Sequence, residues 1–84
     1  MYIVRCTDGT YYTGWSTDVV RRVAVHNAGR GAAYTRTRRP VTLVYQELAA
    51  DRGAAMRREA AVKRYSRKQK ERLIARGQTP GGAT

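Results

Sequence analysis

Five side chains of the kinds that hydrolytic enzymes use lie at spacings that folding could bring together: Tyr2, Tyr12, Arg22, His26 and Glu59. Hydrolysis of a phosphodiester needs an activated water, neutralised charge on the phosphoryl oxygens and a stabilised leaving alkoxide. An arginine presents a permanently charged fork to a phosphate, and a glutamate can hold a divalent metal. If the fold gathers these five side chains, we expect a metal-dependent phosphodiesterase site.

Each of these residues alone also has an ordinary structural interpretation. Tyr2 and Tyr12 could be half-buried strand aromatics. His26 could be a capping or surface histidine. Glu59 could be no more than the helical i to i+4 partner of Lys63. The joint arrangement, rather than any single residue, favours a nuclease site.

Composition narrows the class of partner. The 84 residues carry 17 Lys and Arg against 6 Asp and Glu, a net charge of +11, which indicates a polyanionic partner. Cys6 is the only cysteine, so neither an intrachain disulfide nor a cysteine-based zinc site can form, which suits a reducing compartment. The sequence has no apolar run of bilayer-spanning length and no signal peptide. We therefore expect a cytoplasmic protein that makes no membrane contact.

Two strands are predicted at the start, over residues 1–6 and 10–15, joined by Thr7-Asp8-Gly9. A two-residue turn would place Tyr2 and Tyr12 on opposite faces, because side chains alternate along a strand. A three-residue loop with a left-handed Gly9 pairs Tyr2 with Gly14 and puts both tyrosines on one face, with open space over Gly14. We predict the three-residue loop.

The remaining pattern predicts an α+β fold, a small three-stranded antiparallel sheet flanked by helices in the order ββαβαα. A helix over 18–28, capped by Thr17 or Asp18 and ended by Gly29, carries Arg22 and His26 on one edge. An arginine-rich loop over 30–40 leads to a largely buried strand over 41–48. Helices follow over 51–65 and from a capping box at Ser66 to near Gly77. Residues 1–77 are expected to form one domain, and 78–84 a flexible tail.

These residues resemble the motifs of the GIY-YIG endonuclease superfamily, most closely its small stand-alone bacterial members. Tyr2 matches the first motif, Tyr12-Thr13-Gly14 the second, Arg22 and His26 the helical Arg-x-x-x-His pattern, and Glu59 the later glutamate. The first motif is cut short at Met1, so the first strand begins abruptly or the true start lies upstream. The spacing of ten between the tyrosines is one shorter than in the homing and repair nucleases. Lys63 lies near a position where many members carry asparagine.

The resemblance implies a metal-dependent endonuclease with Mg²⁺ or Mn²⁺ as cofactor. Glu59 is the expected metal ligand and Arg22 the grip on the scissile phosphate. Tyr2 or Tyr12 is expected to act as the general base, with His26 orienting or relaying. A tyrosine serves as a base only if nearby cations lower its pKa, which Arg22, the metal and Lys63 would do.

The other basic residues indicate a surface that grips nucleic acid. The expected partner is DNA, with single-stranded or branched forms favoured and RNA also possible, in repair or recombination, with a possible protein partner for targeting. Tyr34 is expected to stack an unpaired base. Basic residues of the last two helices, among them Arg58 and Arg67, could extend the surface. A non-catalytic RNA- or ribosome-binding module with the same fold is the alternative. The expected substrate-binding residues are Gly14, Arg30, Tyr34, Arg36, Arg38, Arg39 and Lys63.

Overall fold

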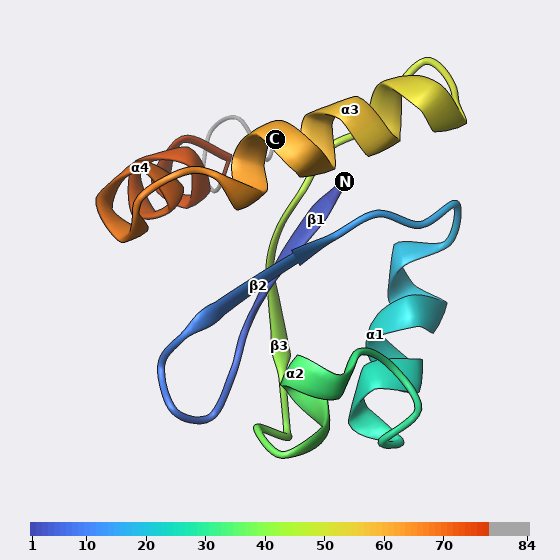
Figure 1. Cartoon of the computed structure of the whole chain (residues 1–84), viewed down its shortest axis with the longest axis vertical. Coiled ribbons are helices and arrows are strands. Elements are labelled where there is room, and N and C mark those ends of the chain that lie inside the picture. The colour runs from blue at the N-terminus through green and yellow to red at the C-terminus, as the bar shows by residue number, and fades with distance from the viewer. Residues whose placement is uncertain (78–84) are drawn as a thin grey trace.

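The computed structural model describes residues 1–77 and shows three strands and four helices (Figure 1). The predicted flexible tail, residues 78–84, lies outside the described residues. The elements in chain order are β1 (Tyr2–Arg5), β2 (Tyr11–Gly14), α1 (Val19–Asn27), α2 (Ala33–Arg36), β3 (Thr42–Gln46), α3 (Arg52–Lys63) and α4 (Arg67–Gly77). The predicted α+β class and the three-stranded antiparallel sheet are confirmed.

The β1–β2 hairpin has the predicted three-residue loop. Gly9 has a positive φ of 84°, and the Cys6 amide donates to the Thr10 carbonyl at 2.8 Å. The register pairs Tyr2 with Gly14 and Val4 with Tyr12. Because side chains alternate, Tyr2 and Tyr12 share one face of the sheet.

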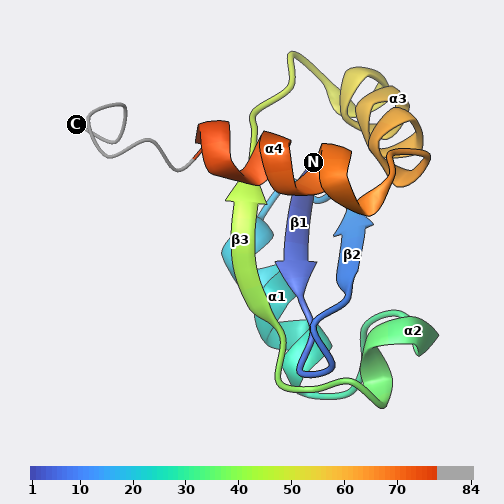
Figure 2. The ribbon, with the colours of Figure 1, turned by 90° about the vertical axis from the view of Figure 1, so that its left-hand side faces the viewer.

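The core lies on both faces of the central strand β1. On one face Tyr2, Val4 and Cys6 pack toward α1, and on the other Ile3 packs with residues of α3 and α4, including Val62. Figure 2 shows α4 crossing the near face of the sheet and α1 behind it. Alternating positions of one short strand therefore serve two separate hydrophobic clusters, and the side chain of Tyr2 points toward α1.

The third strand is less buried than the sequence predicts. The sheet order is β2-β1-β3, so β3 is an edge strand, and its residues are intermediate or exposed. A register shift between Ile3 and Val4 leaves a bulge opposite them. An apolar run cannot by itself distinguish an edge strand from a central one.

Helix α1 begins and ends as its sequence predicts. The side chain of Asp18 accepts from the Arg21 amide at 3.1 Å and caps the first turn. At the other end Gly29 has a φ of 82°, and the Arg30 amide donates to the Val25 carbonyl at 3.1 Å. These two ends fix the helix rotation that turns His26 into the core, where it is fully buried.

The 30–40 segment, predicted as a loop, contains the short helix α2. This helix is a single turn without an apolar periodicity, so the sequence pattern does not indicate it. Its Thr35 is fully buried although its neighbours are exposed. The turn thus buries one polar side chain next to α1, and that side chain enters the site described below.

The last two helices carry the predicted caps. Asp51 accepts from the Ala54 amide at 2.8 Å, and Ser66 and Gln69 exchange hydrogen bonds in a capping box. Helix α3 ends at Lys63, two residues before its predicted end. It lies across the end of the sheet where β1 begins and β2 ends (Figure 1). No helix within residues 1–77 is long and apolar enough to cross a bilayer.

Candidate active site

A buried hydrogen bond joins the first strand to the first helix. Tyr2 Oη lies 2.7 Å from His26 Nε2, and the two residues are 1% and 0% exposed. The hairpin register and the α1 caps produce this contact between residues 24 positions apart. A phenol and an imidazole at this distance can exchange a proton.

The place above Gly14, predicted to be open, is occupied by Tyr2 itself. A Cβ added to Gly14 would lie 2.5 Å from the Tyr2 hydroxyl oxygen, because Tyr2 and Gly14 are directly paired across the strands. Any side chain at residue 14 would displace the phenol. Gly14 is therefore needed to seat Tyr2.

Two residues that the sequence analysis missed hold the other side of the imidazole. Thr35 Oγ1 lies 2.8 Å from His26 Nδ1 and 3.0 Å from the Ala32 carbonyl. A Cβ on Gly31 would collide with His26 Nδ1. No motif gives a signal for Thr35 or Gly31, because both act through the path of the chain between α1 and α2.

Charged groups from two helices act on the same phenol. Burial raises the pKa of Tyr2 above its usual value, while the nearby Arg22 guanidinium opposes the rise, and Tyr12 and Glu59 add to it. Arg22 thus acts in the expected direction, because it lowers the pKa of this tyrosine. Burial has the larger effect, so the pKa is raised rather than lowered. Burial and the nearby Arg22 charge lower the pKa of His26, so the imidazole is neutral near pH 7.

Tyr12 lies beside this pair without a hydrogen bond to the imidazole. Its ring centroid is 5.3 Å from that of His26 in an edge arrangement, and 6.0 Å from that of Tyr34 in a stacked one. Lys63 Nζ lies 5.7 Å from the Tyr12 centroid. Tyr12 therefore connects the buried pair to side chains on the surface.

Glu59 is the carboxylate whose charge acts on Tyr2. Its Oε2 lies 3.5 Å from Lys63 Nζ, and its side chain is 20% exposed. No group of three His, Cys, Asp or Glu side chains among the described residues could form a metal site of its own. Mg²⁺ and Mn²⁺ both take oxygen ligands. In phosphoryl-transfer sites Mg²⁺ keeps several waters, so a single accessible carboxylate suits such an ion. The donor set fits such an ion.

The four arginines of the 30–40 segment differ in whether their side chains bind groups of the protein itself. Arg38 is paired with Asp8 at 3.0 Å and lies 3.9 Å from the Tyr34 centroid. Arg39 donates to the Arg36 carbonyl at 2.9 Å. Arg30 and Arg36 are exposed, and no ion pair involves either side chain in the described part of the chain. The ring of Tyr34 already has Tyr12 stacked against it and Arg38 over it, and stacking of a base on Tyr34 stays a prediction.

Two helical arginines considered for the grip make internal contacts. Arg58 Nε lies 2.7 Å from Glu47 Oε1 and Arg58 Nη1 lies 3.3 Å from Tyr65 Oη, so it ties α3 to the chain after β3. Arg67 pairs with Glu71 at 3.0 Å and donates to the Gly9 carbonyl at 2.9 Å. These two charges are partly neutralised within the protein.

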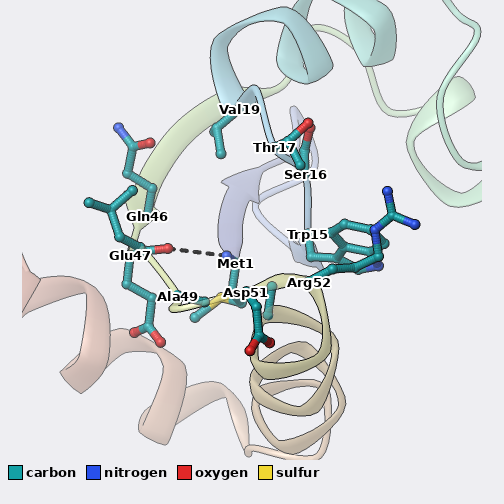
Figure 3. A pocket seen from close by; sticks show the side chains of 12 residues that line it. Met1, Trp15, Ser16, Thr17, Val19, Gln46, Glu47, Ala49, Asp51 and Arg52 are labelled. Atoms are coloured by element: carbon teal, nitrogen blue, oxygen red, sulfur yellow. Dashed lines mark hydrogen bonds between the residues drawn. The ribbon is translucent and has the colours of Figure 1, made fainter.

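A separate hollow of about 320 Å³ lies where β1 begins (Figure 3). The Met1 nitrogen donates to the Glu47 carbonyl at 3.2 Å beside it, and Trp15 and Arg52 form another side of it. None of the predicted site residues lines this hollow. The candidate site is therefore distinct from it.

Comparisons with known proteins agree with these motifs. A family model of the GIY-YIG catalytic domain matches residues 1–72. A UPF0213 protein of Staphylococcus haemolyticus is 55% identical over 74 residues, 88% of this chain and 90% of that protein. A UPF0213 protein of Halobacterium salinarum is 59% identical over 74 residues, 88% of this chain and 96% of that protein.

A solved structure is also similar. The solution structure of a UPF0213 protein from Bacillus halodurans superposes with a TM-score of 0.60 at 46% identity, and the match covers 94% of this chain and 84% of that one. The name UPF0213 states no activity. By sequence and by fold, the chain belongs to the GIY-YIG catalytic domain family, a family of nucleases.

Proposed function

We propose that the chain is an endonuclease that hydrolyses DNA phosphodiester bonds with a bound divalent metal. The observation that carries the proposal is the buried Tyr2–His26 pair, whose phenol lies in the field of both Arg22 and Glu59. Nucleases of this family are typically metal-dependent. A base, a phosphate-binding cation and a metal-binding carboxylate are the three functions that the reaction needs.

Tyr2 is the better candidate for the general base. Only Tyr2, of the two tyrosines, has a hydrogen bond to His26. Because burial raises the pKa of Tyr2, the phenol is protonated before the reaction. It can take a proton from water at Oη as its own proton passes to His26 Nε2, while the water oxygen bonds to phosphorus and the alkoxide leaves. This relay needs no stable phenolate.

Arg22 and Glu59 would act on the phosphate from opposite helices. Arg22 would bind the scissile phosphate through its fork, and its charge also acts on the phenol. Glu59 would hold Mg²⁺ or Mn²⁺, with the Lys63 contact giving way to the metal. When bound, the ion would supply positive charge that offsets the negative charge of the phosphate and of the leaving alkoxide.

The charge of the chain bears on the form of the substrate. A net charge of +11 supports a nucleic acid as the substrate. The exposed side chains of Arg30 and Arg36 support contact with its phosphate backbone beside the site. We favour single-stranded or branched DNA met in repair or recombination, with a protein partner directing the choice of target.

A cleavage assay tests the proposal. Labelled single-stranded, duplex and forked DNA, and a matched RNA, are incubated with the protein with and without Mn²⁺. We expect Mn²⁺-dependent cleavage that Glu59→Gln abolishes while DNA binding persists. Glu71→Gln is the matched control, because Glu71 is the other glutamate in an i,i+4 pair and lies on α4. Undiminished cleavage by Glu59→Gln would overturn the assignment.

The Glu59–Lys63 contact also favours the alternative, a non-catalytic RNA- or ribosome-binding module. A carboxylate engaged with its own lysine at 3.5 Å could serve only the helix. Binding of nucleic acid without cleavage at any Mn²⁺ concentration would decide for this module.

A further inference from the structure

The buried ring of His26 has one partner on each nitrogen. Nε2 lies 2.7 Å from Tyr2 Oη, and Nδ1 lies 2.8 Å from Thr35 Oγ1. A neutral imidazole carries one N–H, so one nitrogen donates and the other accepts. The partners at the two ends decide which nitrogen carries the hydrogen.

At the Tyr2 end the phenol must donate. A phenol carries one hydrogen that it can donate. Because Tyr2 is only 1% exposed, that hydrogen needs an acceptor within the protein. His26 Nε2 is the acceptor at hydrogen-bond distance. If Nε2 carried the hydrogen instead, the phenol hydrogen would be buried without a partner, at a cost of about 1–3 kcal/mol.

At the Thr35 end the hydroxyl must accept. Thr35 Oγ1 donates its single hydrogen to the Ala32 carbonyl at 3.0 Å. Toward His26 Nδ1 the same oxygen then acts as an acceptor, and Nδ1 carries the N–H. Both ends therefore give the same tautomer.

We propose that Thr35 is a positioning residue that holds His26 in the Nδ1–H tautomer, so that Nε2 faces Tyr2 as a proton acceptor. Gly31 assists, because only a residue without a side chain leaves room for the imidazole beside Nδ1. The catalytic value of this arrangement rests on the proposed function, since an Nε2–H tautomer could not take the phenol proton. The tautomer itself does not depend on activity.

Nitrogen NMR reads the tautomer directly. His26 is the only histidine, so long-range ¹⁵N–¹H spectra of the ¹⁵N-labelled full chain contain one imidazole and need no assignment by mutation. Without DNA and near pH 7.5, we expect Nδ1 at the position of a protonated nitrogen and Nε2 at that of a bare one. The reverse pattern in the wild-type protein would overturn the proposal, whether or not the protein cleaves DNA.

Variants of Thr35 test the cause. Thr35→Val keeps the shape and removes the hydroxyl, so we expect a measurable fraction of the Nε2–H form and a fall in cleavage of about 10–100-fold, the usual size for a partner that orients a functional histidine. Thr35→Ser should restore both readouts, and the exposed Thr37→Val should change neither. Unchanged tautomer and rate in Thr35→Val would contradict the proposal.

Two further outcomes keep the test decisive. If Thr35→Val does not fold, the wild-type and Thr35→Ser spectra still decide, because both must show the Nδ1–H form. A wild-type Nδ1–H spectrum in a protein that cleaves nothing would support the role of Thr35 and contradict the nuclease proposal.

Discussion

Two polar clusters lie on opposite sides of the same small sheet and differ in how they balance charge. The histidine cluster, on the α1 side, consists of Tyr2, His26 and Thr35 with Arg22 beside it. The glutamate cluster, on the α3 and α4 side, consists of Tyr45, Glu47, Arg58 and Tyr65. Each contains tyrosine and arginine, yet only the glutamate cluster pairs its arginine with a carboxylate within residues 1–77.

The difference shows what each cluster is suited to do. In the glutamate cluster, hydrogen bonds and charge from Arg58 hold the pKa of Glu47 below its usual value despite burial, and Glu47 in turn raises the pKa of Arg58. Such a matched pair ties the chain after β3 to α3. In the histidine cluster, burial keeps both titratable rings neutral, and no ion pair among residues 1–77 involves Arg22. An unmatched cation beside a proton-accepting pair is suited to an anionic substrate.

Arg22→Lys should have the largest effect, because lysine keeps the charge and loses the planar fork. We expect single-turnover cleavage to fall by about 10²–10³-fold, the usual effect of removing one transition-state donor, with little change in DNA binding. Arg21→Lys, the exposed neighbour on the same helix, is the matched control and should cleave normally. Near-normal turnover of Arg22→Lys would mean that Arg22 only steers DNA.

Glu47→Gln should affect stability rather than chemistry. The change leaves Arg58 without its carboxylate, and because both side chains are partly exposed we expect a loss of about 1–2 kcal/mol in the free energy of unfolding. Denaturant unfolding measures the loss, and the cleavage rate per folded molecule should be unchanged. A cleavage defect as large as that of Arg22→Lys would remove the distinction between the clusters.

Acid should destabilise the fold through His26 before any carboxylate titrates. Burial lowers the pKa of His26 in the folded chain below its unfolded value near ~6.5, so between the two values the unfolded chain binds more protons. Stability is therefore fully present above about pH 6.5 and is lost as the pH falls toward the lowered folded pKa. The slope has a limit of about 1.4 kcal/mol per pH unit for one proton.

Unfolding free energies measured from pH 7.5 down to about pH 5 test this, in a range above the usual carboxylate pKa values. His26→Gln should remove the dependence, because the chain has no other histidine. A slope that persists in His26→Gln would assign it to another group.

The smallest effects are expected at the exposed arginines. Arg30→Ala and Arg36→Ala should each reduce the salt slope of DNA binding by about 0.7–0.9 if each contacts one phosphate. Arg38→Ala should reduce it less, since Asp8 already neutralises part of that charge at 3.0 Å. Binding titrations at several salt concentrations measure the slopes. Equal slopes for all three variants would show that the Asp8–Arg38 ion pair breaks when DNA binds.

Local chemistry made much of the fold predictable. The Gly9 loop fixed the hairpin register, and Asp18, Asp51 and Ser66 marked helix starts, because turns and caps depend on neighbours in the chain. The edge position of β3 and its bulge were missed, since they depend on which strands pair.

The candidate site was likewise predictable only where regular strands and helices position its residues. Strand alternation placed Tyr2 and Tyr12 on one face, and helical spacing placed Arg22 and His26 on one edge. The structure adds that Tyr2 Oη lies 2.7 Å from His26 Nε2. Thr35 and Gly31 were not predictable, because they reach the imidazole through an irregular connection whose path no periodicity encodes. The pKa of Tyr2 was also beyond the sequence, since it depends on the degree of burial.

The most direct test of the account is single-turnover cleavage of labelled forked DNA with Mn²⁺ by the wild-type protein, Tyr2→Phe and Tyr12→Phe. Tyr2→Phe removes one oxygen from a ring that stays packed against Gly14, so folding and DNA binding should persist. We expect the wild-type protein to cleave, Tyr2→Phe to lose cleavage, and Tyr12→Phe, which keeps the rings beside His26, to retain most of it. Cleavage by Tyr2→Phe at the wild-type rate would contradict the assignment of the buried Tyr2–His26 pair as the catalytic centre.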